Sequence, residues 1–276
     1  MKPPTQDSPP PPPALDDAFA GFPAQGGGAA AIASRAAVAR LFWNRDGSRR
    51  VLANSAPLDQ AFANLRPGDL EWISEFNPIA PIYLFPTRWF LRALAQRIRS
   101  CGARRVLEVA AGDGHLSLAL AREAPRLEII ATDSGAWKQS TARMSRAERG
   151  RMDPRGVRGL ALGANVQRIG ALEAIREHAP DLVLASWLPP GPLLSKLIKA
   201  PVQWVLEIGG GSGITGDASC WRFEHDFCDE LDAAARCRLD ERELHSRATL
   251  YCGAANPEFH EEKIGPGHFL WNLRAQ

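Results

Sequence analysis

Short apolar runs recur through the middle of the chain and are separated by polar segments and turn residues. The clearest are Arg105–Val109, Leu127–Thr132, Asn165–Ile169, Asp181–Leu188 and Val202–Ile208. Most of these runs contain two or more consecutive apolar residues, which is typical of strands buried on both faces of a parallel sheet. The pattern therefore predicts an α/β protein, with right-handed crossovers between parallel strands.

Helical patterns lie between these runs. Thr87 is a suitable N-cap for a helix over Arg88–Ser100, and a second helix is expected over His115–Glu123. Beyond residue 217 the alternation of strands and helices ends. There the pattern predicts one helix over Phe223–Arg236, followed by a strand over Ala248–Cys252.

The composition divides the chain into three parts. Residues 1–30 are proline-rich, then rich in glycine and alanine, and are expected to form a disordered tail. Residues 31–86 are expected to form a helical arm or lid, because their aromatic stretch Trp72–Pro86 is too apolar to stay in water. This arm either closes over a binding site or braces the main domain, residues 87–276.

The overall charge gives no reason to expect a nucleic-acid partner. The 276 residues carry a net charge of +2, and the arginine-rich stretch 143–158 is expected to be a solvated surface without interleaved aromatics. Cys220, His225 and Cys228 match no common zinc spacing, so no metal is expected. With no signal core, no membrane-spanning run and no disulfide pattern, we expect a cytoplasmic protein without membrane contact. Its oligomeric state stays open.

The junction between the first two strands carries the strongest chemical signal. An apolar run ends at Glu108, a small-residue loop with Gly112 and Gly114 follows, and the next run ends at Asp133. Glycines allow a tight turn and a close approach of ligand to backbone, and a carboxylate at the second strand tip can accept hydrogen bonds from two ribose hydroxyls. The stretch therefore predicts a nucleotide-binding βαβ unit.

The details differ from a dinucleotide site, since Ala110 holds the first glycine position of that pattern. The stretch resembles motif I of class I S-adenosylmethionine (SAM) methyltransferases instead. The resemblance implies a Rossmann-like class I methyltransferase fold, a seven-stranded mostly parallel sheet with an antiparallel terminal strand, for which His268–Leu273 is the candidate. It also implies SAM as the cofactor, held by Glu108, Ala110, Gly112, Gly114, Asp133, Ser134 and Ser186.

The same resemblance implies a SAM-dependent methyltransferase that acts on a small molecule, in biosynthesis of a specialised metabolite. Tyr83, Asn77 and Ser186 are the candidate catalytic residues. Alignment and desolvation can account for much of such a transfer, so no metal or covalent nucleophile is required. One alternative is attack on the aminocarboxypropyl chain of SAM, for example ring closure to azetidine-2-carboxylate with release of methylthioadenosine. Another is a partner subunit that has lost turnover.

Several other features have competing interpretations. The glycine-rich stretch Gly209–Asp217 lacks a lysine and is expected to be a loop that contacts substrate rather than a second nucleotide site. The stretch Leu188–Gly191 lacks the polar and aromatic ends of the signature found in amino-methylating enzymes. His115 is expected to have a structural role rather than that of a base. Glu173 comes late for contact with an adenine amino group, so adenine recognition stays open.

Overall fold

The computed structural model describes the part of the chain on which the fold and the site depend. The described residues are 40–44, 48–54, 56–62, 82–136, 162–210, 215–216, 218–234 and 246–262. Several sequence predictions lie outside them: the tail 1–30, the residue Asn77, the arginine-rich stretch 143–158, the strand over His268–Leu273, and parts of the stretches Trp72–Pro86 and Gly209–Asp217. Among the described helices, none combines the length and apolar character needed to cross a membrane.

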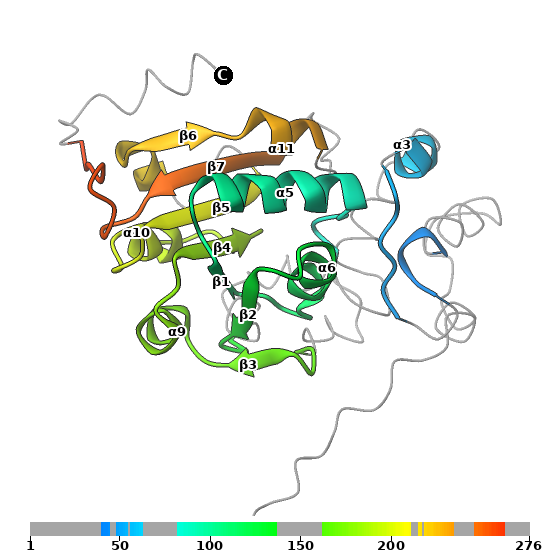
Figure 1. The fold of residues 1–276 in the computed structure, drawn as a ribbon, viewed down its shortest axis with the longest axis horizontal. Coiled ribbons are helices and arrows are strands. Elements are labelled where there is room, and N and C mark those ends of the chain that lie inside the picture. Colours follow the sequence, from blue (N-terminus) through cyan, green and yellow to red (C-terminus); the bar gives the residue numbers. More distant parts are fainter. Residues whose placement is uncertain are drawn as a thin grey trace, which may run out of the picture.

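A seven-stranded sheet forms the centre of the described structure (Figure 1). Its strands lie in the order β3-β2-β1-β4-β5-β7-β6, and only β7 runs antiparallel to its neighbours. This is the strand order of the Rossmann-like class I methyltransferase fold, as predicted. The strands are β1 (Arg105–Val109), β2 (Glu128–Asp133), β3 (Val166–Arg168), β4 (Leu182–Ser186), β5 (Trp204–Gly210), β6 (His225–Phe227) and β7 (Ser246–Cys252).

Helices cover both faces of the sheet, and alternate strand residues contribute to two separate cores. Val106 of β1 packs in one core, where α5, α6 and α11 contribute, while Leu107 packs in the other with α9 and α10. This explains the continuous apolar runs of the sequence. The helices are α3 (Ala56–Phe62), α5 (Arg88–Ser100), α6 (His115–Glu123), α9 (Ala171–His178), α10 (Leu193–Ile198), α11 (Asp229–Ala234) and the 3₁₀ helix η2 (Ala218–Arg222).

The predicted helix over Phe223–Arg236 is wrong in its first half. Residues His225–Phe227 form strand β6, which pairs with β7, and helix α11 begins only at Asp229. The N–H of Cys228 donates to the carbonyl of Ala248, which ends the pairing just before the helix begins. Pairing with a strand distant in sequence overrides the local helical pattern here.

The antiparallel strand also lies earlier in the chain than the position proposed for it. β7 occupies Ser246–Cys252, the stretch predicted as an ordinary strand, and it lies between β5 and β6. The antiparallel strand expected from the resemblance is therefore present as β7, and the stretch His268–Leu273 lies outside the described residues.

Asp181 fixes the register at the amino ends of the central strands β1 and β4. Its Oδ2 atom accepts hydrogen bonds from the N–H groups of Arg104 and Arg105, each at 2.8 Å. The N–H of Asp181 donates back to the carbonyl of Arg105 at 3.0 Å. These bonds join the start of β1 to the start of β4, the two central strands.

We expect Asp181→Ala to lower the free energy of unfolding by about 1–2 kcal/mol, because two backbone N–H groups lose a charged acceptor. Urea unfolding monitored by circular dichroism measures the change. Glu177→Ala, at a 58% exposed side chain on α9, is the matched control and should change stability by less than about 0.5 kcal/mol. Equal effects of the two substitutions would contradict the role given to Asp181.

Candidate functional site

A cavity of about 600 Å³ lies at the carboxyl ends of the central parallel strands. It is lined by the loop after β1, the tips of β2 and β4, and the segment 82–86 that precedes α5. In open α/β sheets this edge is where ligands bind, since loops from neighbouring strands diverge there. The volume is within the range of small-molecule and cofactor sites.

The loop between β1 and α6 lines this cavity, and three of its residues have an uncommon backbone conformation. Ala110, Gly112 and Gly114 all have positive φ angles, of 52°, 58° and 68°. This left-handed conformation costs a residue with a Cβ atom about 1–2 kcal/mol, so Ala110 is strained where a glycine would not be. The sequence prediction that these residues form a tight turn is confirmed, and the turn exposes the backbone of residues 110–112 to the cavity.

Asp133, at the tip of β2, holds this loop in place. Its Oδ2 atom accepts the N–H of Gly112 at 3.0 Å, and its Oδ1 atom accepts the N–H of Gly135 at 2.7 Å. A carboxylate has about four lone-pair positions, so each oxygen can accept one more hydrogen bond. Asp133 and its neighbour Ser134 both line the cavity, and the Ser134 hydroxyl accepts the N–H of Ala136 at 3.2 Å.

Glu108 lies at the end of β1 with its side chain only 3% exposed. Its Oε2 atom accepts hydrogen bonds from the N–H of Ser117, at 3.0 Å, and from the Ser117 hydroxyl. Burial raises the pKa of Glu108 to about 8, and the nearby charges of Asp113 and Asp133 add to the increase. Glu108 is therefore largely neutral at pH 7, and a cation in the cavity would favour its ionised form.

An aromatic pair stands at the tip of β4. The ring of Tyr83 stacks on the ring of Trp187, with centroids 5.8 Å apart and planes at 19°. Trp187 has a positive φ of 53°, and its indole N–H is buried without a hydrogen-bond partner. Tyr83 and Ser186, two of the candidate catalytic residues, both line the cavity beside Trp187.

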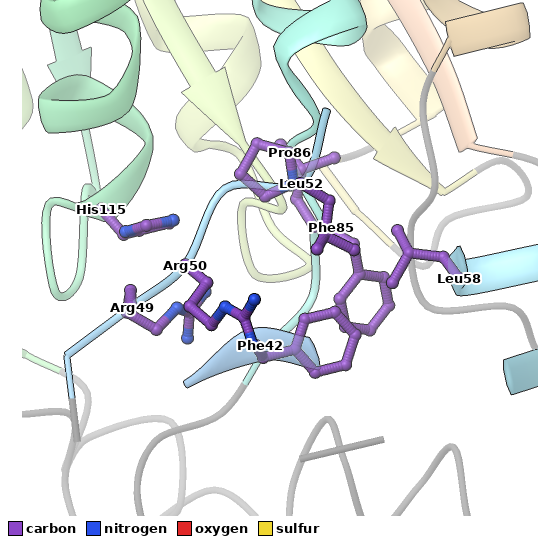
Figure 2. Close-up of a pocket in the computed structure, with 9 residues that line it drawn as sticks. Phe42, Arg49, Arg50, Leu52, Leu58, Phe85, Pro86 and His115 are labelled. Carbon is purple, nitrogen blue, oxygen red and sulfur yellow. The ribbon is translucent and has the colours of Figure 1, made fainter. Parts of the chain in front are cut away.

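Arg49 is a cavity residue that the sequence analysis missed. Its Nη1 atom lies 3.6 Å from Oδ2 of Asp113, and its guanidinium group lies 5.7 Å from the ring centroid of Trp43. Arg49 and His115 also line a smaller pocket that adjoins the cavity (Figure 2). Burial, together with the charge of Arg49, lowers the pKa of His115 to about 4, so His115 is neutral at pH 7.

Two other candidates are not part of the cavity wall. Glu173 is exposed on the first turn of α9 and does not line the cavity. The lining residues include Ala136 and Leu162. Within the described ranges, no three His, Cys, Asp or Glu side chains come close enough together to hold a metal ion. Cys220 and Cys228 contribute to different cores.

The raised pKa of Glu108 predicts a pH-dependent stability. Since the folded pKa of about 8 exceeds the ordinary value of 4.5, the folded state binds more protons between these values and stability falls as pH rises. Glu108→Gln should remove this loss. Its free energy of unfolding should therefore increase relative to that of the wild type by about 1.4 kcal/mol for each pH unit between these two pKa values. Urea unfolding at pH 5, 6.5 and 8 measures the difference.

Glu207 offers a matched control for this experiment. It is also buried, accepts a hydrogen bond from Thr215 at 2.8 Å, and has its pKa raised by burial to about 7. The stability of Glu207→Gln relative to the wild type should stop increasing with pH near pH 7, about one pH unit below the point at which that of Glu108→Gln stops increasing. A stability difference that stays constant from pH 5 to pH 8 would show that Glu108 is ionised throughout.

Comparison with known proteins adds the following. No protein-family model and no curated protein matches the sequence. Among solved structures, the methyltransferase domain of the bacterial CtHen1-C matches with 13% identity over 60% of this chain and 98% of its own, at a TM-score of 0.34. The YcgJ protein of Bacillus subtilis matches with 12% identity over 59% of this chain and 98% of its own, at 0.33.

A third solved structure is the plantazolicin methyltransferase BpumL in complex with S-adenosylhomocysteine. It matches with 10% identity over 60% of this chain and 82% of its own, at a TM-score of 0.32. At these identities the likeness concerns the fold alone. The strand order and the register of the sheet remain the basis of the fold assignment.

Proposed function

We propose that the protein is a SAM-dependent transferase that binds SAM in the cavity over the loop between β1 and α6. The observation that carries this proposal is the joining of the left-handed loop to Asp133, through the hydrogen bond from the Gly112 N–H. It puts an exposed stretch of backbone and a carboxylate with free lone pairs side by side. A nucleoside with two ribose hydroxyls fits that pair of features.

The residues around the loop suit the charges of SAM. Asp133 would accept hydrogen bonds from the ribose, and residues 110–112, which line the same cavity, would hold the chain that leads to the sulfonium. Glu108, neutral in the free protein, can give up its proton beside a cationic ligand. The stacked rings of Tyr83 and Trp187 present π faces at the tip of β4, the kind of surface that stabilises a cation.

When bound, SAM supplies an activated methyl group on a sulfonium. The part of the protein is then to align an acceptor with that group and to exclude water. Tyr83 and Ser186 are the proposed residues for this task, and both line the cavity together with other residues of the segment 82–86. A small-molecule acceptor, as in biosynthesis, suits a cavity of about 600 Å³.

The absence of a nucleic-acid partner remains a prediction. The net charge of +2 is the argument for it. One of the solved structures with a similar fold, ErmE, is a 23S rRNA methyltransferase. BpumL, another, is a plantazolicin methyltransferase. Likeness of fold therefore does not choose between these acceptor classes.

Asp133→Ala should raise the Kd for SAM by roughly 10- to 100-fold, because two ribose hydroxyls lose a charged acceptor and the loop loses an anchor. Isothermal titration calorimetry measures the affinity, and circular dichroism verifies that the variant is folded. Glu173→Ala, at an exposed acid outside the cavity, is the control and should leave the Kd unchanged. An unchanged Kd for Asp133→Ala would rule out the ribose role.

Incubation of the purified protein with SAM alone tests which bond is broken. We expect SAM to be recovered intact by mass spectrometry, since methyl transfer requires an acceptor. Methylthioadenosine formed without an acceptor would instead establish chemistry on the aminocarboxypropyl chain. A protein that does not bind SAM at all would fit the third interpretation, a partner subunit without turnover.

A further inference from the structure

A small hairpin from the N-terminal part of the chain reaches the cavity. We use the term N-terminal hairpin for the paired residues 42–44 and 48–50, in which Trp43 bridges to Arg49 in antiparallel fashion and the N–H of Arg50 donates to the carbonyl of Phe42 at 2.8 Å. Just beyond it, Leu52 bridges to Thr87, which begins α5. The hairpin is thus attached to the main domain, and Arg49 lies at its inner end.

The side chains that line the cavity differ in the charge that they carry near pH 7. The charged or titratable side chains that line it are Arg49, Tyr83, Glu108, Asp113, His115 and Asp133. Glu108 and His115 are neutral near pH 7, because burial raises the pKa of the first to about 8 and lowers that of the second to about 4. Among the described lining residues, Arg49 is therefore the sole cation.

Two donors at this end of the cavity lack acceptors. Nη1 of Arg49 is buried and makes no hydrogen bond, since Oδ2 of Asp113 at 3.6 Å is too far for one. Nε2 of His115 is also buried without a partner, and can donate in the tautomer that carries its proton there. Figure 2 shows Arg49 and His115 on one side of the smaller pocket, with Phe42, Phe85 and Leu58 on the other.

An anionic ligand oxygen would satisfy both donors at once. Arginine has five N–H donors in a planar fork, so Arg49 can keep its ion pair with Asp113 and still bind a second carboxylate. His115 begins α6 directly after the glycine loop, whose residue Gly112 is bonded to Asp133. A ligand whose ribose is held by Asp133 would extend along this loop and bring its opposite end toward Arg49.

We propose that Arg49 and His115 form a carboxylate subsite that binds the α-carboxylate at the amino-acid end of the cofactor. This inference rests on the proposed function and assigns the end of the cofactor that Asp133 does not hold. It also gives the N-terminal hairpin a part in binding, because the hairpin carries the residue that meets this carboxylate. The protein should therefore distinguish ligands that have the carboxylate from those that lack it.

The test compares two ligands that differ only in this group, S-adenosylhomocysteine and its decarboxylated form. Calorimetry with the wild-type protein should show that the carboxylate improves affinity at least about tenfold. In Arg49→Gln this preference should fall to about twofold or less, with the Kd of the decarboxylated ligand unchanged. Arg49→Lys, which keeps the charge, should restore part of the preference.

Arg92→Gln is the matched control. Arg92 lies on α5, is exposed, pairs with Glu123 and lines neither pocket, so its substitution should leave both Kd values unchanged. Equal losses for the two ligands in Arg49→Gln would show that Arg49 only supports the fold, and would overturn the proposal. An unchanged preference would overturn it as well. A wild-type protein that binds neither ligand would refute the proposed function itself.

Discussion

The hydrogen bond from the Gly112 N–H to the carboxylate of Asp133 connects the two strand tips on which the site depends. It spans 3.0 Å between the loop after β1 and the end of β2, and it fixes a backbone that would otherwise have little reason to stay left-handed. A second bond network, from Ser117 to Glu108, attaches the start of α6 to the end of β1. The loop that lines the cavity is thus held from both sides.

Holding the loop in this way has a cost in free energy. Ala110 and Trp187 occupy left-handed backbone conformations at the tips of two adjacent strands, and Glu108 is buried where its charged form is disfavoured. Such features tend to be concentrated at functional sites, where the surrounding structure compensates for them. Here the compensation comes from two cores of fully buried side chains, one on each face of the sheet.

Much of this arrangement could be predicted because its signals are local. The apolar run over Arg105–Val109, the N-cap Thr87 and the helix over His115–Glu123 all appear in the structure within the same bounds. Strand β6 could not be predicted in the same way, since only its pairing with β7 makes three residues a strand. The pKa of Glu108 depends on neighbours that become close only on folding.

Arg49 was missed for a related reason. It lies far from the glycine loop in sequence, in a segment without clear periodicity, and reaches the cavity only through the bridge between Trp43 and Arg49. The turn-forming pair Asp46-Gly47, between a tryptophan and an arginine, was the one available signal of a hairpin. Even that signal would not have indicated which residue faces the cavity.

The measurement that tests this account most directly is a crystal structure of the protein with S-adenosylhomocysteine. The account predicts that the ribose hydroxyls lie within hydrogen-bond distance of the Asp133 carboxylate and that the amino-acid end crosses the loop at Gly112. A nucleoside bound elsewhere on the protein, or with its ribose away from Asp133, would contradict it.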